Sequence, residues 1–498
     1  MPETDEVPPL HRAHGQFAAM AGAYFMGTFN DNFFKQAVML LAVAVGKERF
    51  QGFAAMAFTL PFLLFAAPAG WMADRYPKRN VVIAAKSLEL AAAFLGAAGV
   101  LTGHLWLMVG MVGLMGLQST FFSPALNGSI PELYPLGQVT KANALLRMIV
   151  TLGILLGITL AGIFLGLKGS PILGAAHGRG VVAWAVIAFA LAGLFVRFGI
   201  PSRAAADPGR PFPWSGPLET FRDLGRIRQD HQLGRILLAD MFVWAVGVFQ
   251  LLIINTLGLR EFRLGETRTS LLVAAQLLGL AGGGLLAAHF SKGSRWFRVL
   301  VPAGLTMGLL MGGIAAIPVL PPPLRVPLLF LAIGLAGAAG GLFLIPCESF
   351  LQIRPAPERK GAVWASANFA SFAAMAAASA LYLPLERLRP TLAYGALGAA
   401  CAGFALWLWL EFRKREWGDG SAGFSGVPSG SSQSSGVGSR GPSRVSGGNQ
   451  TSRRATCRAA YSRVQKERRL KNEWASVGAA TPQASRPRCR AMKRALGR

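Results

Sequence analysis

The chain has few cysteines and few charged residues for its length. Its 498 residues include four cysteines, and charged residues make up 15% of the sequence. Cys347 and Cys401 lie in apolar segments, whereas Cys457 and Cys489 lie in the polar C-terminal region. These positions fit neither a disulfide framework nor the ligand spacing of a zinc site. We therefore expect no structural metal and no disulfide scaffold.

Signatures of nucleotide-driven enzymes and of secretion are also missing. No glycine-rich phosphate loop with the P-loop spacing occurs, which argues against direct use of ATP. The first 16 residues contain Glu3, Asp5, Glu6 and three prolines and have no apolar core, so we expect no cleavable signal peptide. The chain is expected not to be an enzyme.

Apolar sequence is abundant. Hydrophobic residues make up 52% of the chain, and the mean hydropathy is +0.42. Runs of about 20 apolar residues are long enough to cross the ~30 Å hydrocarbon core as helices. The sequence predicts an all-α polytopic membrane protein with 12 transmembrane helices in two six-helix halves. The expected spans are residues 17–45, 50–72, 80–102, 104–128, 138–167, 180–198, 232–258, 267–290, 297–319, 325–346, 360–384 and 390–411.

The order of apolar and polar segments predicts five regions. They are an N-terminus at residues 1–16, an N-terminal half at 17–198, a central loop at 199–231, a C-terminal half at 232–411 and a tail at 412–498. The tail is rich in Gly and Ser and then in Arg, so we expect it to be disordered. It is either a solvated or misread segment, or an arm that touches anionic lipid.

Basic residues indicate the orientation. The loops after even-numbered spans carry more Lys and Arg than those after odd-numbered spans, as in the turn with Arg75, Lys78 and Arg79. Because cytoplasmic loops are enriched in basic residues, we expect these loops and both termini to be cytoplasmic. Of the chain-wide net charge of +27, residues 416–498 contribute +12, from 16 basic and 4 acidic residues. The remaining 34 basic and 19 acidic residues give +15, the excess expected of a protein with basic cytoplasmic loops. No nucleic-acid recognition module accompanies the charge, so no nucleic acid is expected as a partner.

A carboxylate stands inside the first apolar segment. Asp31 is flanked by Asn30 and Asn32, and Lys35 follows four residues later on the same helical face. Charged groups inside a membrane cost about 2.5–3.5 kcal/mol on insertion scales and usually mark an ion or substrate path. The alternative is a neutralised structural pair of Asp31 and Lys35. The residues predicted to bind substrate or a coupling ion are Asn30, Asp31, Asn32, Lys35, Gln118, Asn127, Asp240 and Gln250.

The turn between the second and third spans contains a second motif. It reads Gly70-Trp71-Met72-Ala73-Asp74-Arg75-Tyr76-Pro77-Lys78-Arg79. Its glycine would allow close helix approach, and Asp74 could cap a neighbouring helix N-terminus. Arg75 and Arg79 could pair with acids of the adjoining bundle. We expect Gly70, Asp74, Arg75, Lys78 and Arg79 to form a gating loop.

These motifs resemble a known family. The 70–79 turn and the two parallel six-span repeats are similar to the major facilitator superfamily, whose substrate site lies between the halves near the midplane. The segments at 29–35, 118–124 and 153–157 look like those of its lysophospholipid transporter branch, which includes the membrane domain of fused acyltransferase/acyl-carrier-protein synthetase proteins. In that family the 70–79 turn would hold the inward-closed state.

The resemblance implies a secondary transporter of the bacterial inner membrane that moves lysophospholipid or a related amphiphile by alternating access. Its partners would be membrane lipids, the substrate and a separate cytoplasmic acyltransferase; its only cofactor would be a coupling proton or sodium ion. Two other functions stay open: an ion-coupled exporter of drugs or metabolites, and a non-transporting membrane scaffold. Asp31 and the Asp74 turn argue against the scaffold.

Overall fold

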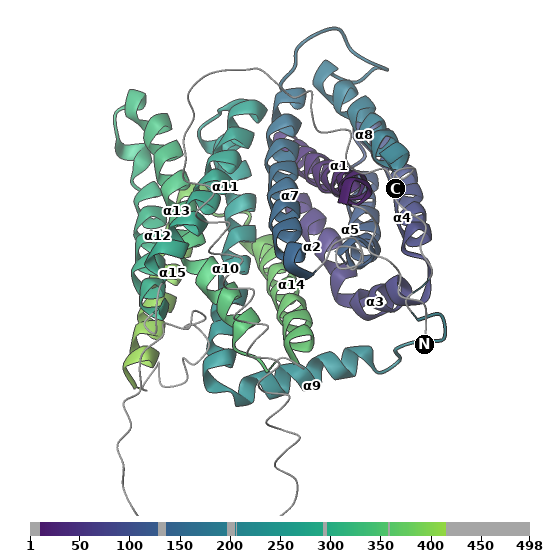
Figure 1. Cartoon of the computed structure of the whole chain (residues 1–498). Helices are drawn as coiled ribbons and strands as arrows, with labels where there is room; N and C mark the ends of the chain where they lie inside the picture. Colours follow the sequence, from purple (N-terminus) through teal and green to yellow (C-terminus); the bar gives the residue numbers. More distant parts are fainter. Residues whose placement is uncertain are drawn as a thin grey trace, which may run out of the picture. The chain divides into compact units, whose positions relative to one another are not determined.

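The computed structural model describes residues 10–127, 136–196, 205, 207–291, 296–356 and 359–414. Almost all of the described chain is helical (Figure 1). Most of the expected tail, residues 415–498, lies outside the described residues, and so do residues 1–9 of the expected N-terminus. The first helix begins at Leu10, seven residues before the apolar run that predicted it.

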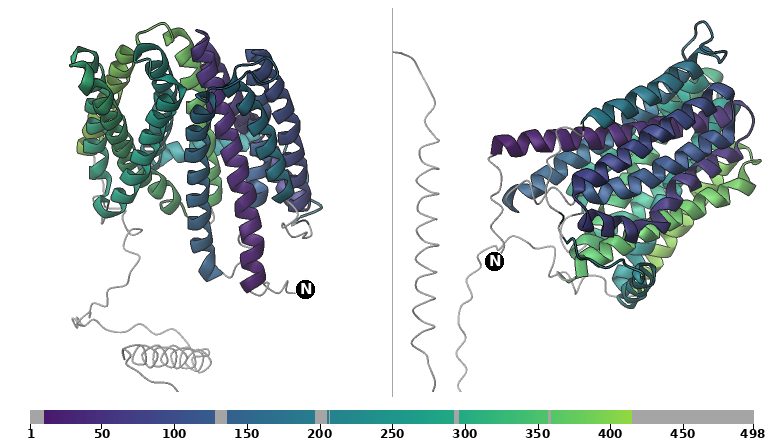
Figure 2. Two further views of the ribbon diagram at one scale, coloured as in Figure 1. Left: turned by 90° about the horizontal axis from the view of Figure 1, so that it is seen from above. Right: turned by 90° about the vertical axis from the view of Figure 1, so that its right-hand side faces the viewer.

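The first group of helices comes from the N-terminal half. It contains α1 (Leu10–Ala44), α2 (Arg49–Leu64), α3 (Ala66–Arg75), α4 (Lys78–Thr102), α5 (Leu105–Asn127), α7 (Leu136–Leu165) and α8 (His177–Val196). The helices α1 and α7 pack along each other, and both views of Figure 2 show their first turns extending beyond their neighbours.

The second group comes from the C-terminal half. It contains α10 (His231–Thr256), α11 (Gly265–Phe290), α12 (Leu300–Ile314), α13 (Pro322–Ile353), α14 (Lys360–Leu385) and α15 (Pro390–Lys414). Short π and 3-10 turns extend three connections: η2 (Leu257–Glu261), η3 (Trp296–Val299) and η4 (Ile317–Val319). The two groups stand side by side in Figure 1, with α2 and α14 in contact between them.

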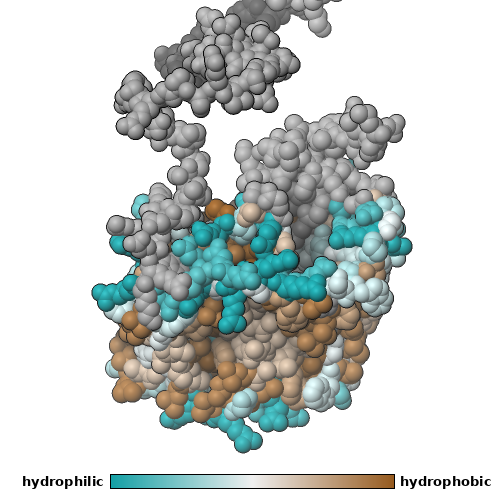
Figure 3. Space-filling model, turned by 90° about the horizontal axis from the view of Figure 1, so that it is seen from below, coloured by the Kyte–Doolittle hydropathy of each residue, from teal (hydrophilic) through white to brown (hydrophobic). Residues whose placement is uncertain are grey.

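Ten described helices are long and apolar enough to cross a membrane, and the bent pair α2 and α3 makes eleven. The remaining long helix of the bundle, α1, carries the polar run around Asp31. In Figure 3 the hydrophobic side chains form a belt with hydrophilic side chains gathered along its edges. The expected all-helical polytopic fold is confirmed.

The second expected span is not one straight helix. It breaks at Phe65, where α2 and α3 meet at an angle of 56°. Pro61 lies inside α2, and a proline removes one backbone hydrogen bond and crowds the preceding turn. The break turns α3, and with it the 70–79 turn, toward the linker between the halves.

That linker contains an element the apolar pattern did not predict, the helix α9 (Gly216–Gln229). It is amphipathic and packs against α14 and α10, and Figure 1 shows it running below the two groups. Asp230 ends α9 and caps α10, because its carboxylate accepts from the backbone N–H groups of Gln232 and Leu233. We call the end of the bundle with α9 the α9 face, and the end with residues 45–48 and 257–265 the opposite face.

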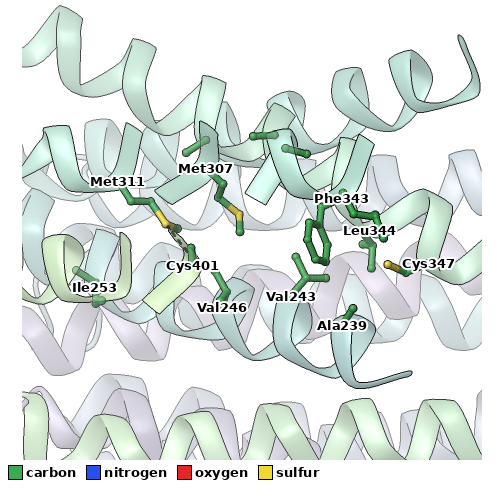
Figure 4. Close-up of a cluster of buried hydrophobic side chains, with 14 of the residues drawn as sticks. Ala239, Val243, Val246, Ile253, Met307, Met311, Phe343, Leu344, Cys347 and Cys401 are labelled. Atoms are coloured by element: carbon green, nitrogen blue, oxygen red, sulfur yellow. Dashed lines mark hydrogen bonds between the residues drawn. The ribbon is translucent and has the colours of Figure 1, made fainter. Parts of the chain in front are cut away.

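The C-terminal half has a dense apolar core. Figure 4 shows side chains from four helices meeting there, among them Val243 on α10, Met311 on α12, Phe343 on α13 and Cys401 on α15. The thiol of Cys401 lies 3.8 Å from the sulfur of Met311. Cys347 and Cys401 are both buried, and neither is paired with another cysteine.

The helices α11 and α13 approach each other through glycines. A Cβ atom added to Gly337 would collide with the backbone carbonyl of Gln276, and one added to Gly283 would collide with that of Ala338. Small residues let membrane helices pack backbone against backbone. The two helices therefore pack in close backbone contact at these glycines.

Candidate substrate and ion site

The carboxylate of Asp31 is held inside the N-terminal half. Asp31 is 4% exposed and faces α5. Its Oδ1 accepts a hydrogen bond from Gln118 Nε2 at 3.1 Å, and its Oδ2 accepts one from the hydroxyl of Ser119. Hydrogen bonds to a buried carboxylate offset part of the cost of removing it from water. The structure thus brings together two of the predicted residues, Asp31 and Gln118, and adds Ser119.

Lys35 forms no direct ion pair with Asp31. Its ammonium lies over the ring of Phe58, with Nζ 4.4 Å from the ring centroid, and no ion pair among the described residues joins it to Asp31. An aromatic face attracts a cation through its quadrupole. The structure therefore shows no direct ion pair of Asp31 and Lys35, although the two groups act on each other electrostatically.

A buried ion pair does lie beside Asp31. Lys86 Nζ is 2.6 Å from Glu89 Oε2, and both side chains on α4 are fully buried. Asn30 donates from Nδ2 to Glu89 Oε1 at 2.9 Å, so the residue next to Asp31 is fixed to this pair. The ammonium of Lys86 also lies 4.6 Å from the ring centroid of Phe122. Two adjacent residues of α1 are thus held by two different helices, α4 and α5.

Two other predicted residues do not join this cluster. Asn32 donates to the carbonyl of Thr28 in its own helix. Gln250 accepts a 2.5 Å hydrogen bond from Gln276, within the C-terminal half. Asn127 ends α5, and its side chain lies outside the described part of the structure.

Asp240 belongs to a separate cluster in the C-terminal half. It is 4% exposed, and Ser371 of α14 donates to its Oδ2 at 2.7 Å. Glu348 on α13 acts on it electrostatically. Glu348 in turn binds Arg147 of α7, with Nη2 3.1 Å from Oε2. This ion pair joins the two halves.

The halves also meet through polar side chains nearer the opposite face. Gln36 of α1 donates to Asn255 of α10 at 2.8 Å, and Asn255 donates to Gln51 of α2 at 3.1 Å. Gln51 in turn donates to Thr256 at 3.1 Å and to the hydroxyl of Tyr382 on α14 at 3.2 Å. The sequence analysis did not predict a role for Gln36 or Gln51. Their only sequence signal is a side-chain amide next to an apolar run.

Two ion pairs lie outside this network. Glu48 and Arg260 are 2.5 Å apart, and Arg49 and Glu386 are 3.0 Å apart. Each pair links α2 or the residue before it to the C-terminal half. Together with the buried amides they close the opposite face of the bundle between the halves.

The 70–79 turn contacts the linker rather than a neighbouring helix end. The carboxylate of Asp74 pairs with the guanidinium of Arg210, and its backbone carbonyl accepts from Asp207 at 2.9 Å. Arg75 and Trp71 both donate to the carbonyl of Arg210, at 2.8 and 3.0 Å. In this structure Asp74 and Arg75 therefore bind the linker. Their expected roles as a helix cap and as the partner of an acid in the inward-closed state stay predictions.

Two further residues of the turn differ from expectation. A Cβ atom on Gly70 would meet nothing within 4 Å, so this glycine does not mediate a close helix approach. The Nε of Arg79 is buried without a hydrogen-bond partner.

The sequence match decides the family. The profile described as Major Facilitator Superfamily matches residues 15–379. The chain belongs to this superfamily. It is thus a multi-pass membrane protein of a transporter family, which confirms the expected superfamily and the expectation of a transport protein rather than an enzyme.

Relatives within the superfamily include a bacterial lipid transporter. The lysophospholipid transporter LplT of Yersinia pestis (strain Pestoides F) is 26% identical over 347 residues, which cover 68% of this chain and 78% of that protein. A lysophospholipid transporter LplT of Yersinia pseudotuberculosis (serotype O:3, strain YPIII) matches with the same identity and the same coverage.

Solved structures share the superfamily fold. The inward-open xylose transporter XylE from E. coli matches with a TM-score of 0.60 and 15% identity, over 80% of this chain and 96% of that one. A bacterial homologue of the human lysosomal transporter Spinster, inward-facing and unoccupied, matches with a TM-score of 0.59 and 16% identity, over 80% and 95%. These likenesses establish the major facilitator architecture of the helices described above.

Proposed function

We propose that this member of the superfamily moves lysophospholipid, or a closely related single-chain amphiphile, across the bacterial inner membrane by alternating access. The Asp31 cluster would bind the coupling proton or sodium ion. The Arg147–Glu348–Asp240 cluster lies between the halves, where superfamily members bind their substrates. Both termini and the α9 face would be cytoplasmic, in keeping with the basic residues of that face.

The observation that supports alternating access is that the two halves are joined by more polar contacts at the opposite face than on the α9 side. At the opposite face, buried amides centred on Gln51 and two ion pairs join α1 and α2 to α10 and α14. On the α9 side of this network, Arg147 and Glu348 form the ion pair between the halves, and the side chain of Arg147 is 64% exposed. A bundle shut at one end by breakable polar contacts can open there when they part.

The surface of α7 and α11 supports an amphiphilic substrate. These helices meet near the opposite face, where Thr267 donates to the carbonyl of Gly162. Toward the α9 face, both helices carry exposed large aliphatic side chains. They are Leu145, Met148 and Leu152 on α7, and Leu278, Leu285 and Leu286 on α11. An acyl chain could stay in contact with this apolar surface while its head group enters between the halves.

The relationship to LplT supports the same substrate class. The alternative, an ion-coupled exporter of drugs or metabolites, is supported by the buried Asp31 alone, because a carboxylate inside a membrane bundle commonly serves ion coupling. Both functions use alternating access, so only substrate flux separates them.

Reconstitution in liposomes tests the proposal. Purified protein is incorporated with a lysophosphatidylethanolamine that carries a reporter in its acyl chain, and movement between leaflets is followed by quenching from outside. Protein-dependent movement is expected, and a hydrophobic dye should not compete with it. If dye is moved and the lipid is not, the exporter function replaces this one. Cysteines introduced one at a time into residues 218–229 test the orientation, because labelling from the periplasm would contradict it.

A further inference from the structure

Three charged side chains from both halves gather on the α9 side of the buried amide network. Arg147 projects from α7, Glu348 from α13 and Asp240 from α10. Arg147 and Glu348 are joined at 3.1 Å, and Glu348 acts electrostatically on Asp240. The group has two carboxylates and one guanidinium, so with all three ionised it carries one excess negative charge.

One oxygen of this group has no partner. Ser371 donates to Oδ2 of Asp240, but Oδ1 is buried and forms no hydrogen bond. A buried carboxylate oxygen without a donor costs free energy. A buried position with two carboxyl groups and an unpaired acceptor oxygen suits a small cationic group that can donate hydrogen bonds.

The guanidinium of Arg147 also has N–H donors that its ion pair with Glu348 does not use. Its ion pair with Glu348 uses one nitrogen of a group that has five N–H donors in a planar fork. That fork matches the oxygens of a phosphate group. Arg147 is also the exposed member of the group, whereas Glu348 and Asp240 are buried, so an incoming anion would meet the arginine first.

We propose that Arg147, Glu348 and Asp240 form a subsite for a zwitterionic head group that carries a phosphate and a primary ammonium. Arg147 binds the phosphate, while Glu348 and Asp240 accept hydrogen bonds from the ammonium. The inference rests on the proposed function and adds the head-group class and the residues that select it. Replacement of the Arg147–Glu348 contact by contacts to substrate would also couple occupancy to the separation of α7 from α13.

The test compares two head groups on one acyl chain. Lysophosphatidylethanolamine has the phosphate and the ammonium, whereas lysophosphatidylglycerol has the phosphate only. Their initial rates of movement are measured in proteoliposomes for the wild type and for Asp240→Asn, Glu348→Gln and Arg147→Gln. Arg268→Gln is the matched control, since Arg268 is an exposed arginine near the opposite face.

In Asp240→Asn and Glu348→Gln, we expect the ethanolamine-to-glycerol rate ratio to fall about tenfold, the scale of one hydrogen bond to a charged group. Movement of the glycerol lipid should persist and shows that these variants fold. Arg147→Gln should slow both lipids to a similar degree, and Arg268→Gln should leave both rates unchanged.

The possible failures are distinct. If the wild type moves neither lipid, the proposed function fails. If the wild type moves them but Asp240→Asn and Glu348→Gln keep its rate ratio, the subsite assignment is wrong while the function stands. An equal loss of both lipids in these two variants also overturns the assignment, because it would show a structural role without selection of the ammonium.

Discussion

Asp31 on α1 and Gln118 on α5 are joined by a 3.1 Å hydrogen bond from the amide to the carboxylate. The bond lies inside the N-terminal half, between helices that are 87 residues apart at this point. It gives the carboxylate a fixed place in the bundle, while Lys35 binds the ring of Phe58 instead. A carboxylate fixed in this way without an ion-pair partner is a candidate to bind a coupling ion.

Asp31→Asn should abolish movement of substrate driven by a proton or sodium gradient. Asparagine keeps the size of the side chain and can still hydrogen-bond to Gln118 and Ser119, so the fold should persist, but its neutral amide neither takes up a proton nor attracts sodium. The measurement is substrate movement in proteoliposomes with and without an imposed gradient.

Asn32→Ala is the matched control for Asp31→Asn. The amide of Asn32 donates to the carbonyl of Thr28 in the same helix, so its loss should leave gradient-driven movement within about twofold of the wild type, the scale of one weak local bond. A gradient response in Asp31→Asn equal to that of the wild type would exclude Asp31 as the coupling site.

Asp74→Ala and Arg210→Gln should shift the conformational balance in the same direction. Both side chains are substantially exposed, and exposed ion pairs contribute about 0–1 kcal/mol. The pair is present while the opposite face is closed. Its loss should therefore raise the population of the state with the opposite face open, relative to the closed state, by up to about fivefold. The measurement is cross-linking between cysteine pairs placed across the α9 face, combined with equilibrium binding of substrate.

Asp223→Asn provides the comparison on the same face. Asp223 pairs with Arg226 within α9, at 3.0 Å, and does not tie the 70–79 turn to the linker. Cross-linking in this variant should match the wild type. If Asp74→Ala also matches it, the turn acts only as a basic anchor for membrane topology.

The pair of Lys86 and Glu89 should affect stability in a way that depends on which partner is removed. Loss of one member leaves a fully buried charge unpaired, which costs about 3–5 kcal/mol, whereas apolar replacement of both is often neutral. Glu89→Gln or Lys86→Met should therefore lower the thermal unfolding temperature in detergent. The double variant K86M/E89M should recover most of that loss.

This cycle has a clear negative result. If the double variant is destabilised by the sum of the two single changes, the two residues act independently and the 2.6 Å contact contributes little to stability. Because Asn30 also donates to Glu89, gradient-driven movement in the stable double variant reports whether Asn30 must be held for Asp31 to function.

The positions of the helices could be predicted from the sequence because each span is a continuous apolar run. The structure places α4 at Lys78–Thr102 and α14 at Lys360–Leu385, within two residues of the expected ends. The break at Phe65 and the helix α9 were not predicted. The first depends on local geometry after Pro61, and the second lies in a polar segment that contains no long apolar run.

The site could be predicted only in part. Asp31 and Gln118 were found because polar residues are rare inside apolar runs. The ion pair of Arg147 and Glu348 was not predicted, since these residues are 201 positions apart and meet only through the packing of α7 against the other half. Composition and spacing identify costly residues within one helix, but they do not determine which residue of another helix offsets the cost.

Gln51→Leu should weaken closure of the opposite face. The amide of Gln51 is fully buried and connects Asn255, Thr256 and Tyr382 across the halves. Leucine has a similar volume but no polar group. When the halves close, the amide donor of Asn255 and the hydroxyl acceptors of Thr256 and Tyr382 would therefore lose their partner. Leaving such a group unsatisfied costs about 1–3 kcal/mol, which shifts the ratio of closed to open molecules about 5- to 150-fold.

The shift can be measured with Ser270→Cys as a reporter. Ser270 is fully buried and lies 3.4 Å from Gln36 in the closed network, so its thiol should react with a membrane-impermeant reagent only when that face opens. Gln51→Leu should raise the labelling rate of the reporter. Thr59→Val is the control, because Thr59 is a buried residue of α2 whose hydroxyl donates only to carbonyls of its own helix. Equal labelling of the reporter in the Gln51→Leu, Thr59→Val and wild-type backgrounds would show that the amide network is not the gate.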